Sequence, residues 1–264
     1  MKLVLAATLL VSLSVSANQK NWVPKIQKEA TKKTKKVKIT PTTPLEALYL
    51  KQPKGKEHLA LLKNESLKLK QEAVPTLIKV MKSSDYPDQN RWIATYMLGR
   101  IMGKKSSNFI SKFTQHPNWM MRLASLKVLL HLDQKQYKGI YARMLEDKSL
   151  IVRHQALQNI KEMKLKTLAP YVWKMLYNKE NYVGNKGNRK RSHIVKTAIK
   201  VIGDLDFKDA KMPMLKMMQK KKYKDIYKEL DYALSIIDGK KSPDGSMAIK
   251  KNYWNKVALK SITL

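Results

Sequence analysis

Cysteine is absent from this chain of 264 residues, which excludes disulfide frameworks, thiolate metal sites, cysteine nucleophiles and acylation of an N-terminal cysteine. Glycine is scarce, with nine residues, and strand-like alternation is nearly absent, so an all-β fold is disfavoured. Acidic residues number 20 against 54 Lys and Arg, which gives a formal net charge of +34. Hydrophobic residues make up 43% of the chain, so it can bury a core and is not wholly disordered.

Motifs for catalysis and metal binding are missing too. The sequence contains no Gly-x-Ser-x-Gly, no Ser-x-x-Lys and no His-Glu-x-x-His, and its five histidines lack metal-ligand spacing. Asp204, Asp206 and Asp209 alternate with apolar residues, which is typical of a turn with helix caps rather than of a calcium loop. We therefore predict no enzyme, no metal and no cofactor; if the chain were an enzyme, Glu162 and Asp231 would be the candidate acids.

Residues 1–17 have the pattern of a cleavable secretion signal. Lys2 precedes an apolar run of eleven residues at 3–13, and small residues follow up to Ala17. Eleven apolar residues are too few for a membrane-spanning helix, which needs about 20. We therefore expect cleavage after Ala17, export to the periplasm or the exterior, and no transmembrane span. The alternative is a buried N-terminal helix.

Residues 18–43 are strongly basic and lack a helical pattern. They contain eight lysines and a single acidic residue, Glu29, and the threonine- and proline-rich stretch at 39–44 disfavours a helix. We expect a disordered basic linker in this segment.

From residue 44 to 240 the apolar periodicity is helical, and one register recurs. A small residue followed four places later by an aliphatic one occurs five times, at intervals of 31, 31, 42 and 35 residues. The small residues are Ala94, Ser125, Ala156, Ala198 and Ala233. An amphipathic segment and a polar turn precede each of them. The pattern predicts an all-α fold of about five helix–turn–helix units.

The second helix of these units resembles that of a HEAT repeat. The stretches at 121–126 and 152–157 each contain an aliphatic–Arg pair, two variable residues and a small–aliphatic pair, and Arg91 repeats the pattern. Val195 and Leu230 hold the arginine position in the last two units. The short period is similar to that of the HEAT repeats of phycobilisome lyases.

The resemblance implies a right-handed α-solenoid over residues 44–240 that binds partners on its concave face. Arg91, Arg122 and Arg153 are then ladder residues, which bind acids or carbonyls of a neighbouring repeat. Residues 241–264 lack the repeat pattern, and we expect this C-terminal extension to cap the exposed apolar face of the last repeat.

Candidate binding residues follow from the same register. Positions two before and two after each small residue point away from the packed side of the second helices, which in the family line the concave face. We call the following residues the polar stripe: Trp92, Tyr96, Lys127, His154, Gln158, Lys196 and Lys200. Aromatic, basic and amide groups in such a row suit an anion, a sugar or an extended peptide. The alternative is a solvated helix face.

The interval of 42 residues marks an insertion at 178–192. This basic loop contains two glycines and the candidate anion-binding residues Lys186, Arg189, Lys190 and Arg191. Long loops on a rigid scaffold often carry binding, although a basic hairpin without a ligand is the alternative.

The charge favours an anionic partner, because most of the net charge of +34 falls outside residues 1–43, and like charge destabilises a folded chain through self-repulsion. We therefore expect an exported scaffold that binds an acidic protein or an anionic envelope polymer through its concave face and basic loop. A nucleic-acid- or polyanion-binding solenoid is the first alternative, although export disfavours nucleic acid. An accessory subunit of an enzyme is the second, and a lysine-rich host proteome would make the charge incidental.

Overall fold

The computed structural model describes residues 40–183 and 190–260. The chain divides into two units, Met1–Lys38 and Ile39–Leu264, and the described residues all belong to the second. The expected signal peptide and almost all of the expected basic linker lie outside the described residues. The described part is helical nearly throughout, so the predicted all-α class is confirmed.

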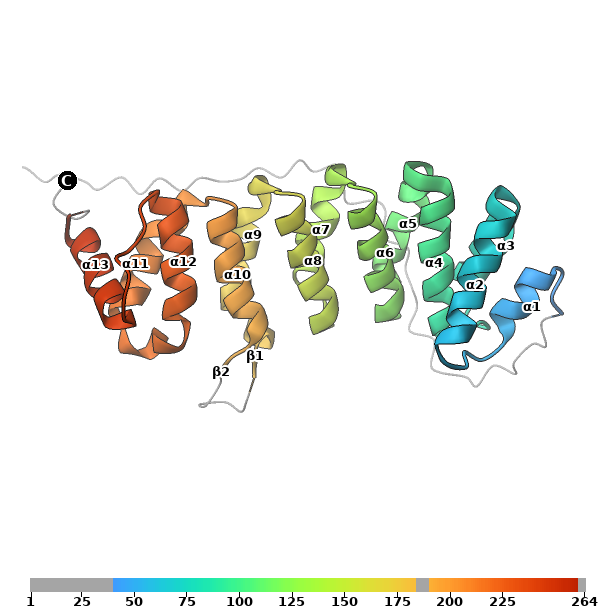
Figure 1. The fold of residues 1–264 in the computed structure, drawn as a ribbon, viewed down its shortest axis with the longest axis horizontal. Helices are drawn as coiled ribbons and strands as arrows, with labels where there is room; N and C mark the ends of the chain where they lie inside the picture. The colour runs from blue at the N-terminus through green and yellow to red at the C-terminus, as the bar shows by residue number, and fades with distance from the viewer. Residues whose placement is uncertain (1–39, 184–189, 261–264) are drawn as a thin grey trace, which may run out of the picture. The chain divides into compact units, whose positions relative to one another are not determined.

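The elements follow one another in the order drawn in Figure 1. The helices are α1 (Pro44–Leu50), α2 (Gly55–Leu69), α3 (Val74–Lys82), α4 (Asp88–Met102), α5 (Ser107–Lys112), α6 (Trp119–His131), α7 (Lys138–Met144), α8 (Leu150–Glu162), α9 (Ala169–Lys174), α10 (His193–Asp204), α11 (Lys211–Gln219), α12 (Tyr227–Asp238) and α13 (Met247–Lys260). Short 3-10 helices extend several of them, among them η7 (Met175–Tyr177), η8 (Lys179–Asn181) and η10 (Lys221–Ile226).

Long even-numbered helices stand next to one another in chain order. Helix α4 contacts α6, α6 contacts α8, α8 contacts α10 and α10 contacts α12, while α3, α5, α7, α9 and α11 each pack against the even helix that follows (Figure 1). The five small residues that define the register are fully buried within the even helices. A small side chain at this point allows neighbouring helices to approach closely.

The inserted loop forms the exception to this alternation. Strands β1 (Tyr182–Val183) and β2 (Lys190–Arg191) pair antiparallel, with Tyr182 opposite Arg191. This short hairpin lies between η8 and the start of α10, and it accounts for the longest interval in the register.

Arginines connect the turns of the first three units. Arg122 donates two hydrogen bonds to the carboxylate of Asp147, at 2.7 and 2.8 Å, and two more to the carbonyls of His116 and Pro117. Arg153 donates to Asn181 Oδ1 at 2.8 Å and to the Asp147 carbonyl at 2.6 Å. These side chains thus link each unit to the next.

Arg91 occupies the corresponding position in α4. Its guanidinium donates to the Met81 carbonyl at 3.0 Å and lies 3.0 Å from the Nε2 atom of His116 in the following unit. The prediction that these arginines bind acids or carbonyls of a neighbouring repeat is confirmed for Arg122 and Arg153. For Arg91 it is wrong, because its carboxylate and carbonyl partners, Asp88 and Met81, belong to its own unit and it meets the next unit through the His116 ring.

A buried carboxylate fixes α1. Glu46 accepts hydrogen bonds from Thr42 and Tyr86, and it forms an ion pair with Lys79 Nζ at 2.6 Å. Burial by itself raises the pKa of this carboxyl, but the bonds from Lys79, Tyr86 and Thr42 outweigh it and lower the pKa to about 2.

A second buried carboxylate holds α13 against α12. Asp231 accepts hydrogen bonds from Ser242 Oγ at 2.6 Å, Trp254 Nε1 at 2.8 Å and Lys250 Nζ at 2.8 Å. Burial opposes ionisation, yet the bonds from Lys250, Ser242 and Trp254 lower the pKa of Asp231. The Trp254 side chain is fully buried, so the C-terminal extension is part of the core.

Candidate anion-binding site

The N-terminal part of the polar stripe is aromatic. The rings of Trp92 and Tyr96 on α4 are stacked, with centroids 6.3 Å apart and planes 7° apart, because residues four apart lie on one face of a helix. Tyr96 also lies 6.2 Å from the ring of His131 on α6. Both α4 rings are half-buried, so part of each face remains open to solvent.

The middle of the polar stripe consists of exposed side chains and one histidine pair. Lys127 on α6 and Gln158 on α8 are exposed, whereas His154 is half-buried and stacks on His193 of α10 at 6.1 Å. Burial lowers the pKa of His154, and the nearby His193 lowers it further.

The stripe meets a basic hollow at its C-terminal end. Lys196 of α10 lines a hollow of about 600 Å³ together with lysines from three other elements, whereas Lys200 is exposed one turn further along. We call this hollow the basic hollow, and its lysines are Lys196, Lys221, Lys224, Lys228 and Lys251. Tyr227, Met247 and the acidic residues Asp225 and Glu229 also line it.

The lysines lie where helices begin. Lys196 and Lys228 are in the first turns of α10 and α12, and Lys251 follows the first turn of α13. The N-terminus of a helix carries a partial positive charge, so lysines there are unfavourable for folding and favourable for binding an anion. Three helix starts and five lysines therefore converge on one hollow.

Like many other lysines of the described residues, those of the basic hollow form no ion pair with a carboxylate. Lys250 pairs with Asp231 at 2.8 Å and Lys211 with Asp238 at 2.5 Å, but no ion pair joins a lysine of the basic hollow to a carboxylate in the described part of the chain. The Lys251 ammonium instead lies 5.6 Å from the centre of the Tyr227 ring.

The basic loop is described only at its ends. Lys186 and Arg189 lie outside the described residues, while Lys190 and Arg191 form β2, opposite Val183 and Tyr182. Ser192, whose hydroxyl donates a hydrogen bond to the Asn181 carbonyl, is the one residue between β2 and α10, so β2 leads the chain directly to the first turn that carries Lys196.

The sequence prediction missed most of the hollow. It contained Lys196, but Lys221, Lys224, Lys228 and Lys251 come from η10, α12 and α13 and meet Lys196 only through the packing of those helices. The lysine run at 220–224 was the available signal.

The acids named as enzyme candidates do not have the environment that acid–base catalysis needs. Both oxygens of Asp231 accept hydrogen bonds and its pKa is lowered, whereas a general acid needs a raised one. Glu162 is exposed at the end of α8.

Asp204 and Asp206, near the end of α10, bind different partners and do not share a ligand site. Asp204 accepts a hydrogen bond from Tyr232 at 2.5 Å, and Asp206 pairs with Lys208 at 2.7 Å. Within residues 40–183 and 190–260, no three His, Asp or Glu side chains are grouped closely enough to hold a metal ion.

No family model matches the chain, and no curated protein matches its sequence. None of the helices in the described ranges combines the length and the apolarity that crossing a bilayer requires. Function therefore has to be inferred from the geometry and charge of this chain.

Proposed function

We propose that this protein is an exported, non-enzymatic scaffold of HEAT-like repeats that binds an acidic protein or another anionic partner of the cell envelope. In this proposal the even helices form the partner-binding side of a right-handed α-solenoid and α13 is its C-terminal cap. The ordered contacts of α4 to α12, the buried small residues and the arginine ladder support the solenoid.

The observation that carries the proposal is the basic hollow. Five lysines from four elements line it, and three of them are placed at the positive ends of helices, where they weaken folding. An anion would gain hydrogen bonds and charge from several of them at once. The stripe residues Lys127 and Lys200 and the basic loop would extend this contact.

Charge reversal tests the proposal. We expect the mature protein, from Asn18 onward, to bind a fluorescent polyglutamate peptide, and Lys196→Glu with Lys228→Glu to weaken binding about tenfold or more because two ammonium groups become repulsive. The matched control is Lys104→Glu with Lys112→Glu, which changes the net charge equally at exposed sites on η3 (Gly103–Ser106) and α5.

Fluorescence anisotropy at about 50 and about 300 mM salt provides the measurement. If both double variants lose the same affinity, the charge acts without a site and the proposal fails. Tighter binding of duplex DNA than of polyglutamate, with a steep salt dependence, would instead support the nucleic-acid alternative.

A further inference from the structure

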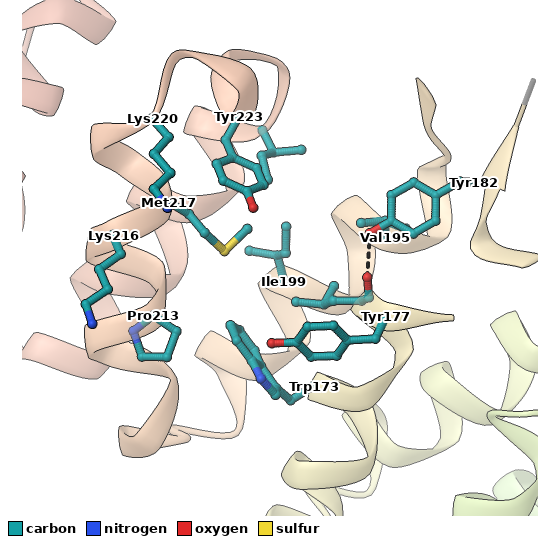
Figure 2. A pocket seen from close by; sticks show the side chains of 12 residues that line it. Trp173, Tyr177, Tyr182, Val195, Ile199, Pro213, Lys216, Met217, Lys220 and Tyr223 are labelled. Carbon is teal, nitrogen blue, oxygen red and sulfur yellow. Dashed lines mark hydrogen bonds between the residues drawn. The ribbon is translucent and has the colours of Figure 1, made fainter. Parts of the chain in front are cut away.

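A second hollow lies between α9 and α11, with α10 as its floor. Its volume is about 350 Å³, and in Figure 2 Trp173 and Tyr177 form one wall, Met217 and Tyr223 the other, and Ile199 lies between them. We call this hollow, with Tyr182, Val195, Lys216 and Lys220 among its other lining residues, the aromatic pocket.

The pocket occupies the place of a missing ladder arginine. Val195, which lines it, stands three residues before the small residue Ala198, as Arg91 does before Ala94. The Arg91 guanidinium reaches the end of α3 and the turn after the next odd helix. In the fourth unit, among the described residues that line the corresponding space between the ends of α9 and α11, no arginine is present.

The walls of the pocket are held in place. Trp173 and Tyr177 form an edge-to-face pair with centroids 6.3 Å apart, and the Tyr182 hydroxyl donates a hydrogen bond to the Leu176 carbonyl at 2.5 Å. Tyr177 nevertheless remains 70% exposed, which is unusual for an aromatic ring beside an apolar floor.

The charge around the pocket selects its occupant. Lys216 on α11 and Lys220, the residue that follows the end of α11, are both exposed, and the described lining contains no acidic residue. The interior offers ring faces and aliphatic carbons together with the hydroxyls of Tyr177 and Tyr223 (Figure 2). A side chain of phenylalanine or leucine size fits the interior, and carboxylates fit the two ammonium groups.

We propose that the aromatic pocket binds an acidic segment of a partner protein, which inserts one aromatic or aliphatic side chain and places carboxylates against Lys216 and Lys220. This inference rests on the proposed function only in that the partner is acidic. The pocket adds an apolar specificity element that the basic hollow does not have.

Two labelled peptides test it with the full mature chain. In the first, one phenylalanine is flanked on each side by two glutamates; in the second, alanine replaces the phenylalanine. We expect the phenylalanine peptide to bind at least about tenfold more tightly by fluorescence anisotropy, because a buried aromatic anchor dominates such contacts.

Variants assign the preference to the pocket. Tyr177→Ala, at an exposed ring, should reduce the ratio of the two affinities to near one, and Val195→Arg should do the same by filling the pocket with the missing ladder side chain. The control is Tyr171→Ala on α9, the helix that η7 continues, which removes a ring that is 51% exposed and does not line the pocket. It should leave the ratio unchanged.

The outcomes separate this inference from the proposed function. Reversing Lys196 and Lys228 alters the basic hollow alone, so the loss of phenylalanine-peptide binding on Tyr177→Ala should persist in that background. Equal affinity of the two peptides for the unmodified protein, or an equal effect of Tyr171→Ala and Tyr177→Ala, would overturn the pocket alone. Tyr177-dependent binding of a carboxylated glycan such as hyaluronan, without a preference for phenylalanine, would also overturn it.

Discussion

The position three residues before the buried small residue differs between the two halves of the described chain. In α4, α6 and α8 it is Arg91, Arg122 and Arg153, and each guanidinium is hydrogen-bonded to a turn of the neighbouring unit. In α10 it is Val195, which lines the aromatic pocket. The same position therefore either closes the gap between successive units with a buried cation or leaves that gap apolar.

This difference has a physical consequence for both halves. A buried guanidinium needs a partner for each of its N–H groups, so it restricts the turns around it to sequences that supply carbonyls or carboxylates. A valine makes no such demand. The inserted loop before α10 and the two hollows that we propose as binding sites lie where the ladder has ended.

The largest effect that we predict comes from breaking the ladder. Arg122→Ala leaves Asp147 buried without its cation and removes two hydrogen bonds to carbonyls. We expect a loss of about 3–5 kcal/mol in the free energy of unfolding, measured by urea denaturation followed by circular dichroism. Lys127→Ala on the same helix, at an exposed site, should change stability by no more than about 0.5 kcal/mol. A loss below about 1 kcal/mol for Arg122→Ala would show that the ladder does not hold the units together.

The buried carboxylate of Glu46, which lies in α1, should dominate the acid sensitivity of the protein. The pKa of Glu46 is lowered in the folded state from 4.5 to about 2, so its contribution to stability is complete above the unfolded pKa and is lost as the pH falls toward 2. The shift corresponds to about 3 kcal/mol. We expect the unmodified protein to lose stability between pH 5 and 2 more steeply than Glu46→Gln, as measured by urea denaturation at each pH.

The comparison with Asp231→Asn sharpens this prediction. The pKa of Asp231 is also lowered, so the same sign applies to the C-terminal half. If neither variant changes the slope of stability against pH, then other carboxylates determine acid unfolding.

Local patterns explain what the sequence predicted correctly. The positions of Ala94, Ser125 and Ala156 follow from a helical period that needs no knowledge of the fold, and the arginine partners lie in the adjacent turns. The all-α class and the ladder contacts of Arg122 and Arg153 could therefore be predicted.

Long-range packing explains what the sequence did not predict. The sequence offers Asp231 as a candidate catalytic acid, because it does not show that Trp254, 23 residues away, donates a hydrogen bond to this carboxylate. Trp173 and Tyr177 are spaced as core residues of a helix would be, and only the arrangement of α9 and α11 leaves Tyr177 exposed beside a pocket. Sequence spacing gives the face of a helix but not what covers that face.

The smallest predicted effects concern two glycines at equivalent close contacts between even helices. A Cβ atom at Gly203 would lie 2.6 Å from the Cα atom of Ala233 in α12, whereas one at Gly99 would meet the Cγ1 atom of Val128 in α6. Alanine is favoured over glycine in a helix by about 1 kcal/mol, so the sign of each substitution depends on what must move.

At Gly203 the obstacle is backbone, so α10 and α12 would have to separate, and we expect Gly203→Ala to cost about 1–3 kcal/mol net. At Gly99 the obstacle is a side chain that can shift, so Gly99→Ala should be less destabilising. Gly139→Ala in α7 has nothing within 4 Å and serves as the control, which we expect to gain up to about 1 kcal/mol. Thermal melts of the three variants measure the order, and a Gly203→Ala protein as stable as Gly139→Ala would mean that the contact between α10 and α12 is looser than the structure has it.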